Sequence, residues 1–276
     1  MSEKSVITLD YAAHWYLPSG KPYHTVIAKS GKERATNLTD ARKEGAFRSV
    51  TSVQKFAARP QLEIWSKNEL LDAIREIPFD PETDDQEKYI AKLIRRHDAE
   101  KEHGARRGNV LHATFEAFVN GGPIKSRLRK FVEAVQAALT PYGINLQEGI
   151  AESSFFNHRG FGGTIDWHNC EPDAADNYYI LDYKGKRKIE DDKELAYDNH
   201  AQQLAAYRYG LLQPGATCLN VFIDEQAKVV VHQWEEPVLR RELRKFFALL
   251  DYVNIHDRRN MKDIPESKIR YKKRTL

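Results

Sequence analysis

The sequence lacks most of the features that mark out easily recognised protein classes. It contains only two cysteines, Cys170 and Cys218, in 276 residues. Two thiols cannot build a four-cysteine iron–sulfur site or a zinc ribbon, and so few are typical of a reducing compartment. The first residues are polar, and no run approaches the ~20 apolar residues that a membrane-spanning helix needs. We therefore expect a cytoplasmic protein that does not associate with membranes.

A strong charge of one sign is also missing. The chain carries 43 Lys and Arg against 40 Asp and Glu, which gives a net charge of +3. Any basic surface must therefore be local, because the charge of the whole chain does not indicate a nucleic-acid binder. Hydrophobic residues make up 41% and charged residues 30% of the sequence, as is usual for a globular protein.

Several catalytic motifs are absent from the sequence. There is no Gly-x-x-x-x-Gly-Lys-Ser/Thr phosphate loop, so we expect no use of ATP. Neither a complete dinucleotide-binding fingerprint nor a His-Glu-x-x-His zinc helix is present. The Gly-x-Ser-x-Gly turn of serine hydrolases is missing too. The chemistry must therefore lie in less conspicuous groups.

The order of predicted elements indicates an α/β (α+β) fold with a mixed central sheet flanked by helices. We predict helices over 62–77, 84–103, 109–119, 126–139, 195–212 and 237–255, and strands over 26–28, 147–156, 160–167, 178–183, 216–222 and 229–234. A further helix should begin near 49–53, capped by Thr51 or Ser52, and end at Pro60. Gly104 and Gly108 are expected to separate the second helix from the third.

This pattern suggests three parts: a helical N-terminal region over 1–104, a core over 105–258 and a basic tail over 259–276, exposed at 268–274. The predicted helix 62–77 carries an apolar stripe of Leu62, Trp65, Leu70 and Ile74. The charged helix 84–103, which contains Arg95 and Arg96, is a candidate DNA surface, although such helices are more often simply solvated.

The stretch from Gly162 to Lys184 carries the strongest chemical signal. Two predicted strands run into acids, the first ending on Asp166 and the second on Asp182 and Lys184. Because side chains alternate along a strand, Asp182 and Lys184 should share a face while Tyr183 points into packing. Two adjacent carboxylates repel each other, and a divalent cation relieves that repulsion. An Asp after a strand is commonly a turn former, but the neighbouring Asp-x-Lys favours a metal site here.

Other candidate residues are individually weaker. His112 on an apolar helix is more often a buried core histidine than a ligand, although imidazole binds Mn²⁺ and tolerates Mg²⁺. Glu152 could face solvent, add a carboxylate near the metal or pair with Lys184. Gln203 and Tyr207 share a helix face, where Gln203 would bond the lysine or a phosphate and Tyr207 would pack or contact a nucleic-acid backbone.

These residues, in this order, resemble the PD-(D/E)xK nuclease superfamily, specifically its RecB-like exonuclease branch. The five matching elements are Gly108 with His112, Glu152, Gly163 with Asp166, Asp182 with Lys184, and Gln203 with Tyr207. The segment from Ser49 to Trp65 is also similar, more loosely, to the lead-in of phage-type and mitochondrial genome-maintenance exonucleases. The chain departs from the branch in having no proline before Asp166, no iron–sulfur cysteine cluster and no helicase domain.

The resemblance implies a restriction-endonuclease-like fold and one or two Mg²⁺ or Mn²⁺ ions. The implied metal ligands are His112, Asp166, Asp182 and the carbonyl of Tyr183, and the implied catalytic residues are Asp166, Asp182, Lys184 and Glu152. The implied substrate-binding residues are Gln203, Tyr207, Lys186 and Arg187, the last two from a basic run that would otherwise be a solvated loop.

The function expected from this resemblance is metal-dependent hydrolysis of DNA from an end, in repair, recombination or replication. The alternatives are a structure- or sequence-specific endonuclease of the same superfamily, or a non-catalytic nucleic-acid-binding or assembly protein. The expected partners are single- or double-stranded DNA ends and a recombination, helicase or single-strand-binding protein. The expected setting is a bacterial or phage-infected cell.

Overall fold

A six-stranded mixed sheet forms the centre of the computed structural model, which describes residues 13–57, 60–169, 171–173, 176–259 and 264–270. Its strand order is β10-β5-β6-β7-β8-β9. The strands span Ile150–Asn157 (β5), Phe161–His168 (β6), Tyr179–Gly185 (β7), Thr217–Ile223 (β8), Val229–Gln233 (β9) and Lys268–Arg270 (β10). Only β7 and β8 pair in parallel, and the helix α6 (Asp198–Gly210) connects them. The expected mixed α/β architecture with flanking helices is therefore confirmed.

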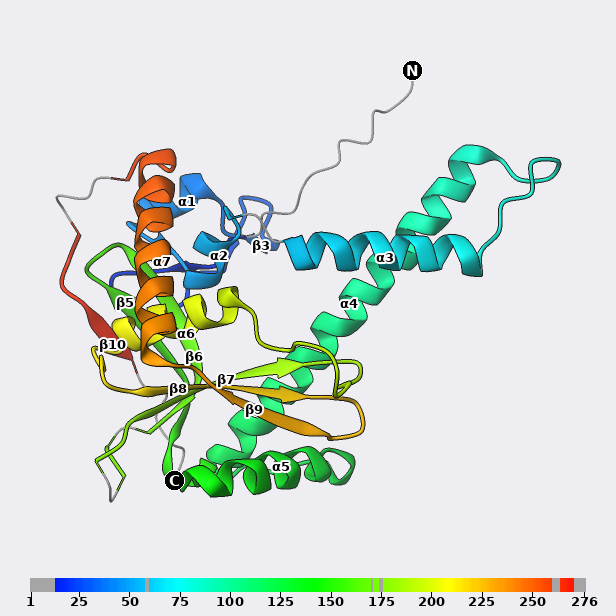
Figure 1. Cartoon of the computed structure of the whole chain (residues 1–276). Coiled ribbons are helices and arrows are strands. Elements are labelled where there is room, and N and C mark those ends of the chain that lie inside the picture. Colours follow the sequence, from blue (N-terminus) through cyan, green and yellow to red (C-terminus); the bar gives the residue numbers. More distant parts are fainter. Residues whose placement is uncertain (1–12, 58–59, 170, 174–175, 260–263, 271–276) are drawn as a thin grey trace.

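Helices cover both faces of the sheet (Figure 1). On one face, α6 and α7 (Glu236–His256) bury Phe155, Ile180 and Phe246. On the other, α5 (Ser126–Leu139) and the C-terminal half of α4 (Gln86–Val119) bury Phe115 and Leu181. The adjacent residues Ile180 and Leu181 pack in opposite layers because side chains alternate along a strand. Two short 3-10 turns, Thr140–Tyr142 and Leu146–Glu148, connect α5 to β5.

The neighbouring strands β5 and β6 switch faces partway along their length. Ala151 and Trp167 pack in the α4–α5 layer, whereas Phe155 and Ile165 pack in the α6–α7 layer. Regular alternation would keep Ile165 and Trp167 on one face. The switch occurs at the level of Glu152, whose φ of 53° is left-handed. The regular alternation of side chains in β5 and β6 is thus interrupted at Glu152.

The N-terminal region is less helical than expected. It contains two strand pairs, β1 (Trp15–Tyr16) with β4 (Phe47–Arg48) and β2 (Thr25–Ile27) with β3 (Glu33–Ala35). It also contains two short helices: α1 (Leu38–Lys43) lies between β3 and β4, and α2 (Val50–Gln54) follows β4. Ser49 caps α2 by accepting from the Ser52 amide, so the expectation of Thr51 or Ser52 as the cap is wrong. Arg48 pairs with the buried Asp257 at 2.5 Å, which ties this region to the end of α7.

A helical arm extends away from the sheet (Figure 1). It consists of α3 (Pro60–Glu76) packed against the N-terminal half of α4, which is a single helix of 34 residues. The expected break at Gly104 and Gly108 is therefore wrong, and α4 passes through the boundary placed at residue 104. The expected apolar stripe is only partly buried, since Trp65, Leu70 and Ile74 remain 37%, 40% and 41% exposed. The fourth member, Leu62, has a side chain outside the described set.

The C-terminal segment differs from expectation as well. Residues 268–270 pair with β5 as the edge strand β10 rather than forming a free tail, although Lys268 and Arg270 are exposed as expected. Residues 271–274 lie outside the described residues. Among the helices that the structure describes, none combines the length and apolarity needed to cross a membrane.

Candidate active site

The candidate site lies where β6 and β7 separate. These strands pair only at Trp167–Leu181 and His168–Ile180. Beyond that point the Oδ2 atom of Asp166 accepts the amide hydrogen of Tyr183 at 2.7 Å. The carboxylate thus replaces the backbone carbonyl that a paired strand would offer, which satisfies the buried amide and fixes the side chain in the fork.

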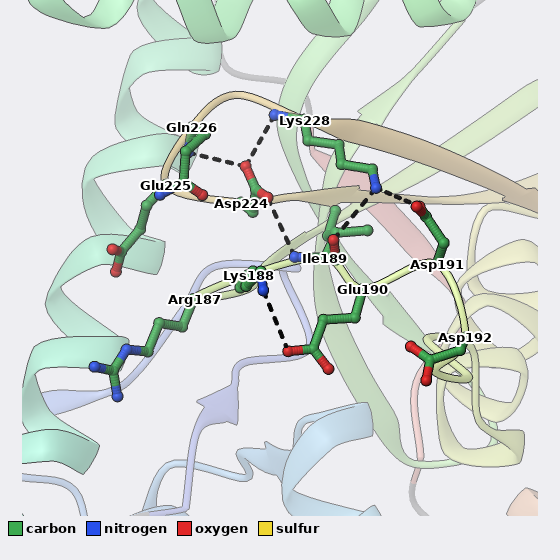
Figure 2. A pocket seen from close by; sticks show the side chains of 10 residues that line it. All are labelled: Arg187, Lys188, Ile189, Glu190, Asp191, Asp192, Asp224, Glu225, Gln226 and Lys228. Carbon is green, nitrogen blue, oxygen red and sulfur yellow. Dashed lines mark hydrogen bonds and ion pairs between the residues drawn. The ribbon is translucent and has the colours of Figure 1, made fainter.

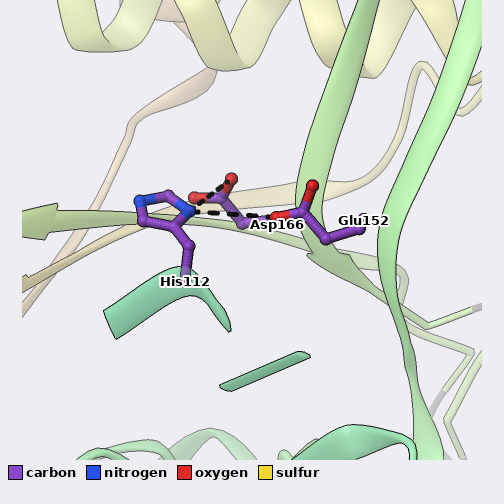
Figure 3. A group of neighbouring side chains, drawn as sticks. All are labelled: His112, Glu152 and Asp166. Carbon is purple, nitrogen blue, oxygen red and sulfur yellow. Dashed lines mark ion pairs between the residues drawn. The ribbon is translucent and has the colours of Figure 1, made fainter. Parts of the chain in front are cut away.

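Three possible metal ligands meet at this fork (Figure 3). His112 comes from α4, Glu152 from β5 and Asp166 from β6, and one ligand atom from each lies within 4.8 Å of the others. The Nδ1 atom of His112 is 3.2 Å from Asp166 Oδ1 and 3.9 Å from Glu152 Oε1. All three side chains are partly exposed, so an ion could enter from solvent.

The backbone at Glu152 is strained in a way that serves this cluster. A left-handed φ of 53° is unfavourable for a residue with a Cβ atom. The β5–β6 ladder skips this level, pairing Ala151 with Trp167 and Ser153 with Ile165. Such strain concentrates at functional sites, where the surrounding structure holds it in place.

The electrostatics of the cluster favour a positive charge. Burial lowers the pKa of His112, but Asp166, Asp182 and Glu152 outweigh it and raise the pKa to about 9. At neutral pH the imidazole therefore carries a proton between two carboxylates. A divalent cation would meet the same negative field. Carboxylate oxygens are usual donors for Mg²⁺ and Mn²⁺, whereas imidazole is more usual for zinc, iron, copper and nickel.

Lys184 and Asp182 lie on the α6 side of the fork. The ammonium of Lys184 donates to Asp182 Oδ1 at 2.9 Å and to Gln203 Oε1 at 3.1 Å, and lies 2.7 Å from Asp182 Oδ2. Gln203 donates back to Asp182 Oδ1 at 2.8 Å, and Asn220 donates to Oδ2 at 2.7 Å. The expected shared face of Asp182 and Lys184 is confirmed, as is the expected contact between Gln203 and the lysine.

Asp182 is buried and held by hydrogen bonds, and its implied role as a metal ligand stays a prediction. Its side chain is 2% exposed, and both carboxylate oxygens already accept hydrogen bonds. It does not belong to the three-residue cluster found among the described residues. Burial raises the pKa of Asp182 more than Lys184 lowers it, and Asp166 raises it further. In this arrangement Asp182 positions Lys184, whereas Glu152 is the carboxylate that joins Asp166 and His112.

Tyr183 and Tyr207 pack inside the protein. The Tyr183 ring stacks on Phe115 with centroids 4.4 Å apart, as the strand period predicts. Tyr207 is 5% exposed and its hydroxyl accepts from Gln203 at 2.9 Å. Tyr207 therefore packs in the core, as one of the two expectations has it, and its contact with a nucleic-acid backbone stays a prediction.

The basic run after β7 is more ordered than a solvated loop. Lys186 lies 5.3 Å from the Phe222 ring and is partly buried, whereas Arg187 is exposed. Asp224 accepts the amides of Ile189 and Lys228 at 3.2 and 2.9 Å, which ties the loop to the β8–β9 turn. Figure 2 shows the contacts of Asp224. The residues drawn there line a pocket of about 890 Å³.

Residues that the sequence analysis missed complete the site. Asn220 holds Asp182 and also accepts from the Trp234 indole at 2.7 Å. A polar residue inside the apolar run Cys-Leu-Asn-Val-Phe was the available signal, because a buried amide needs partners. The Tyr16 hydroxyl bonds Thr164 at 2.7 Å, and nothing in the sequence links these distant residues.

The two motif glycines have different surroundings. A Cβ at Gly163 would lie 2.8 Å from the Phe155 ring and 2.9 Å from the Tyr207 ring, so close packing requires a glycine. A Cβ at Gly108 would meet nothing within 4 Å. Packing thus explains the first glycine and leaves the second without a steric reason.

Comparisons with known proteins leave the family of this chain open. No family model matches it, and no curated protein matches it. Among solved structures it is similar to "Crystal structure of SSO0001" at 13% identity, with a TM-score of 0.26, over 53% of this chain and 87% of that chain. A similarity this weak carries no argument about fold or function.

Proposed function

We propose that the chain is a metal-dependent deoxyribonuclease with a restriction-endonuclease-like fold, related to the RecB-like branch of the PD-(D/E)xK superfamily, and that it degrades DNA from an end. The observation that supports this most is the meeting of the cluster of His112, Glu152 and Asp166 with the lysine site at one strand fork. Cation ligands beside a lysine suit phosphodiester hydrolysis.

The donor set of the cluster fits Mg²⁺ or Mn²⁺. His112, Glu152 and Asp166 would hold the ion, which would take the place of the proton that the two carboxylates now retain on the imidazole. Such an ion makes water more acidic and stabilises negative charge on phosphate oxygens. For Asp182 to join the ion, as the resemblance implies, Lys184 would have to release one of its oxygens.

The protein groups then have separate tasks. Asp182 and Gln203 hold the Lys184 ammonium, whose charge orients an attacking water or stabilises charge developing on the phosphate. The hydrogen bond from Lys184 to Gln203 is longer than the one to Asp182, and Gln203 is uncharged. A phosphate oxygen can therefore replace Gln203 more easily than Asp182. Asn220 keeps Asp182 in place from the next strand.

Digestion of end-labelled single strands, blunt duplexes and closed circles with Mg²⁺ or Mn²⁺ tests this function. We expect metal-dependent loss of linear DNA, intact circles and no activity in Lys184→Ala. Lys188→Ala removes an exposed lysine of the same loop and should cut like the wild type. Because Lys184→Ala leaves the buried Asp182 without its cation, a thermal melt must establish that the variant is folded.

Other results would redirect the proposal. Cleavage of closed circles would indicate an endonuclease of the same superfamily. DNA binding without cleavage by the wild type would favour a non-catalytic binding or assembly protein, and cleavage that survives EDTA would exclude the metal-dependent reaction.

A further inference from the structure

A second polar pocket lies beside the candidate active site, between the helical arm and the loop after β7. It has a volume of about 480 Å³, and its wall includes Trp65 of α3, Gly104 and Arg107 of α4, and Gly185, Lys186 and Arg187. Gly185 directly follows Lys184 in β7, so the pocket begins next to the active-site lysine. Lys186 and Arg187 are among the substrate-binding residues that the resemblance implies, whereas the α3 and α4 residues of the wall belong to none of its motifs.

Trp65 gives the pocket an aromatic wall. It is 37% exposed, whereas Trp15 and Trp167 are 1% and 2% exposed. Its nearest ring neighbour is His97, at a centroid distance of 6.3 Å. An indole left accessible beside a polar pocket is the kind of surface on which an unpaired base stacks.

Cations also line this pocket. Arg107 pairs through Nη1 with Glu225, but its Nε atom is buried and has no hydrogen-bond partner among the described residues. Burial, together with the neighbouring Lys184, lowers the pKa of Lys186, so an approaching anion would stabilise its charge. Glu69 and Glu225 also line the pocket. A mixed wall with an aromatic ring and several cations fits a nucleotide better than a free anion.

Gly104 leaves a stretch of bare backbone in the α4 wall of the pocket, between His103 and Arg107, which also line it. A Cβ at Gly104 would meet nothing within 4 Å, although glycine weakens a helix interior. A glycine there lets a ligand approach the helix closely. Gly104 lies eight residues before His112 on the same helix, roughly 12 Å along its axis. A strand that passes through the active site could therefore also reach the pocket.

We propose that this pocket is a subsite for an unpaired nucleotide of the DNA strand being cut, with its base stacked on Trp65. Arg107 and Arg187 would face its phosphates. The inference rests on the proposed nuclease function and makes it more specific: the strand enters single-stranded along the arm, because bases within a duplex are already covered by their neighbours.

Substitution of Trp65 tests the subsite. Binding of a short single-stranded oligodeoxynucleotide is measured with Ca²⁺ as the divalent cation. Trp65→Ala should raise Kd by about 5- to 150-fold, the range for loss of one stacked base. Leu71→Ala removes another exposed apolar side chain of α3 that is 51% exposed and does not line the pocket. It should bind like the wild type, and Trp65→Phe should retain most of the affinity.

An abasic oligonucleotide separates stacking from a general loss of structure. The wild type and Trp65→Ala should bind it equally, because no base remains to stack. Base-containing strands should also quench the tryptophan fluorescence of the wild type, and Trp65→Phe should lose that quenching. If Trp65→Ala binds the base-containing strand normally, or is weakened equally on the abasic strand, the subsite is wrong.

Cleavage measured in parallel distinguishes the two proposals. If the wild type cuts DNA with Mg²⁺ and Trp65→Ala cuts and binds equally well, the nuclease proposal stands and the subsite proposal is refuted. If the wild type does not cut DNA but binds it in a base-dependent way through Trp65, the nuclease proposal is refuted and the subsite proposal stands.

Discussion

Neutralising Asp166 should abolish cation binding while leaving the fold intact. In Asp166→Asn the amide oxygen can still accept the Tyr183 amide hydrogen that Oδ2 now accepts at 2.7 Å. The change therefore keeps the strand fork and removes one of the two carboxylates that face His112. Without that charge the cluster no longer attracts a divalent cation strongly.

The size of the effect follows from linkage. A cation present at 100 times its Kd stabilises the folded state by about 2.7 kcal/mol. For a chain of this size that corresponds to a rise in melting temperature of roughly 5 to 10 °C. Wild type should show this rise with Mn²⁺ or Mg²⁺, whereas Asp166→Asn should show little or none. Thermal melts with and without the cation measure both.

Glu190→Gln is the matched control, because Glu190 is a carboxylate outside the cluster that pairs with Lys193. It should keep the full cation-induced rise. A rise retained in Asp166→Asn, or lost in Glu190→Gln, would refute the assignment of the cation to the strand fork. No rise in the wild type would mean that the protonated His112 is the only cation the cluster holds.

Two further predictions concern stability. Gly163→Ala should lower the free energy of unfolding, measured in urea, by about 1–3 kcal/mol, because the new Cβ would lie 2.8 Å from the Phe155 ring. The control Gly215→Ala, whose Cβ would meet nothing within 4 Å, should be nearly neutral. Equal effects of the two substitutions would contradict the packing argument. Burial and nearby lysines lower the pKa of His200 from 6.5 to about 3, so below pH 6.5 the unfolded chain takes up a proton that the folded one excludes. As the pH is lowered below 6.5, the free energy of unfolding should therefore decrease by up to about 1.4 kcal/mol per pH unit. Protonation of His200 would also break the hydrogen bond that its neutral Nδ1 accepts from the Tyr197 amide. His200→Gln should flatten this slope, and an unchanged slope would rule His200 out as its source.

Much of the fold was accessible from local patterns. The apolar runs around β5 to β9 and the turns between them predicted the mixed sheet within a few residues, because strand burial repeats with a short period. The same period placed Asp182 and Lys184 on one face, and the two groups do contact each other. Local signals failed for α4, since Gly104 and Gly108 suggested a break that the helix does not have. Each glycine costs a helix only about 1 kcal/mol, and the burial of Leu111 and Phe115 outweighs that.

The sequence by itself determined the order of the elements and the residue types at the site, because both depend on neighbours within one helix or strand. Only the tertiary structure decided which groups meet. His112, Glu152 and Asp166 come together because two strands switch faces at one level and β6 parts from β7 there. Asp182 turns toward Lys184 and Asn220 because a buried carboxylate needs partners from the next strand. The contacts within the cluster and between Asp182 and Asn220 join segments far apart in the chain, and no local pattern specifies them.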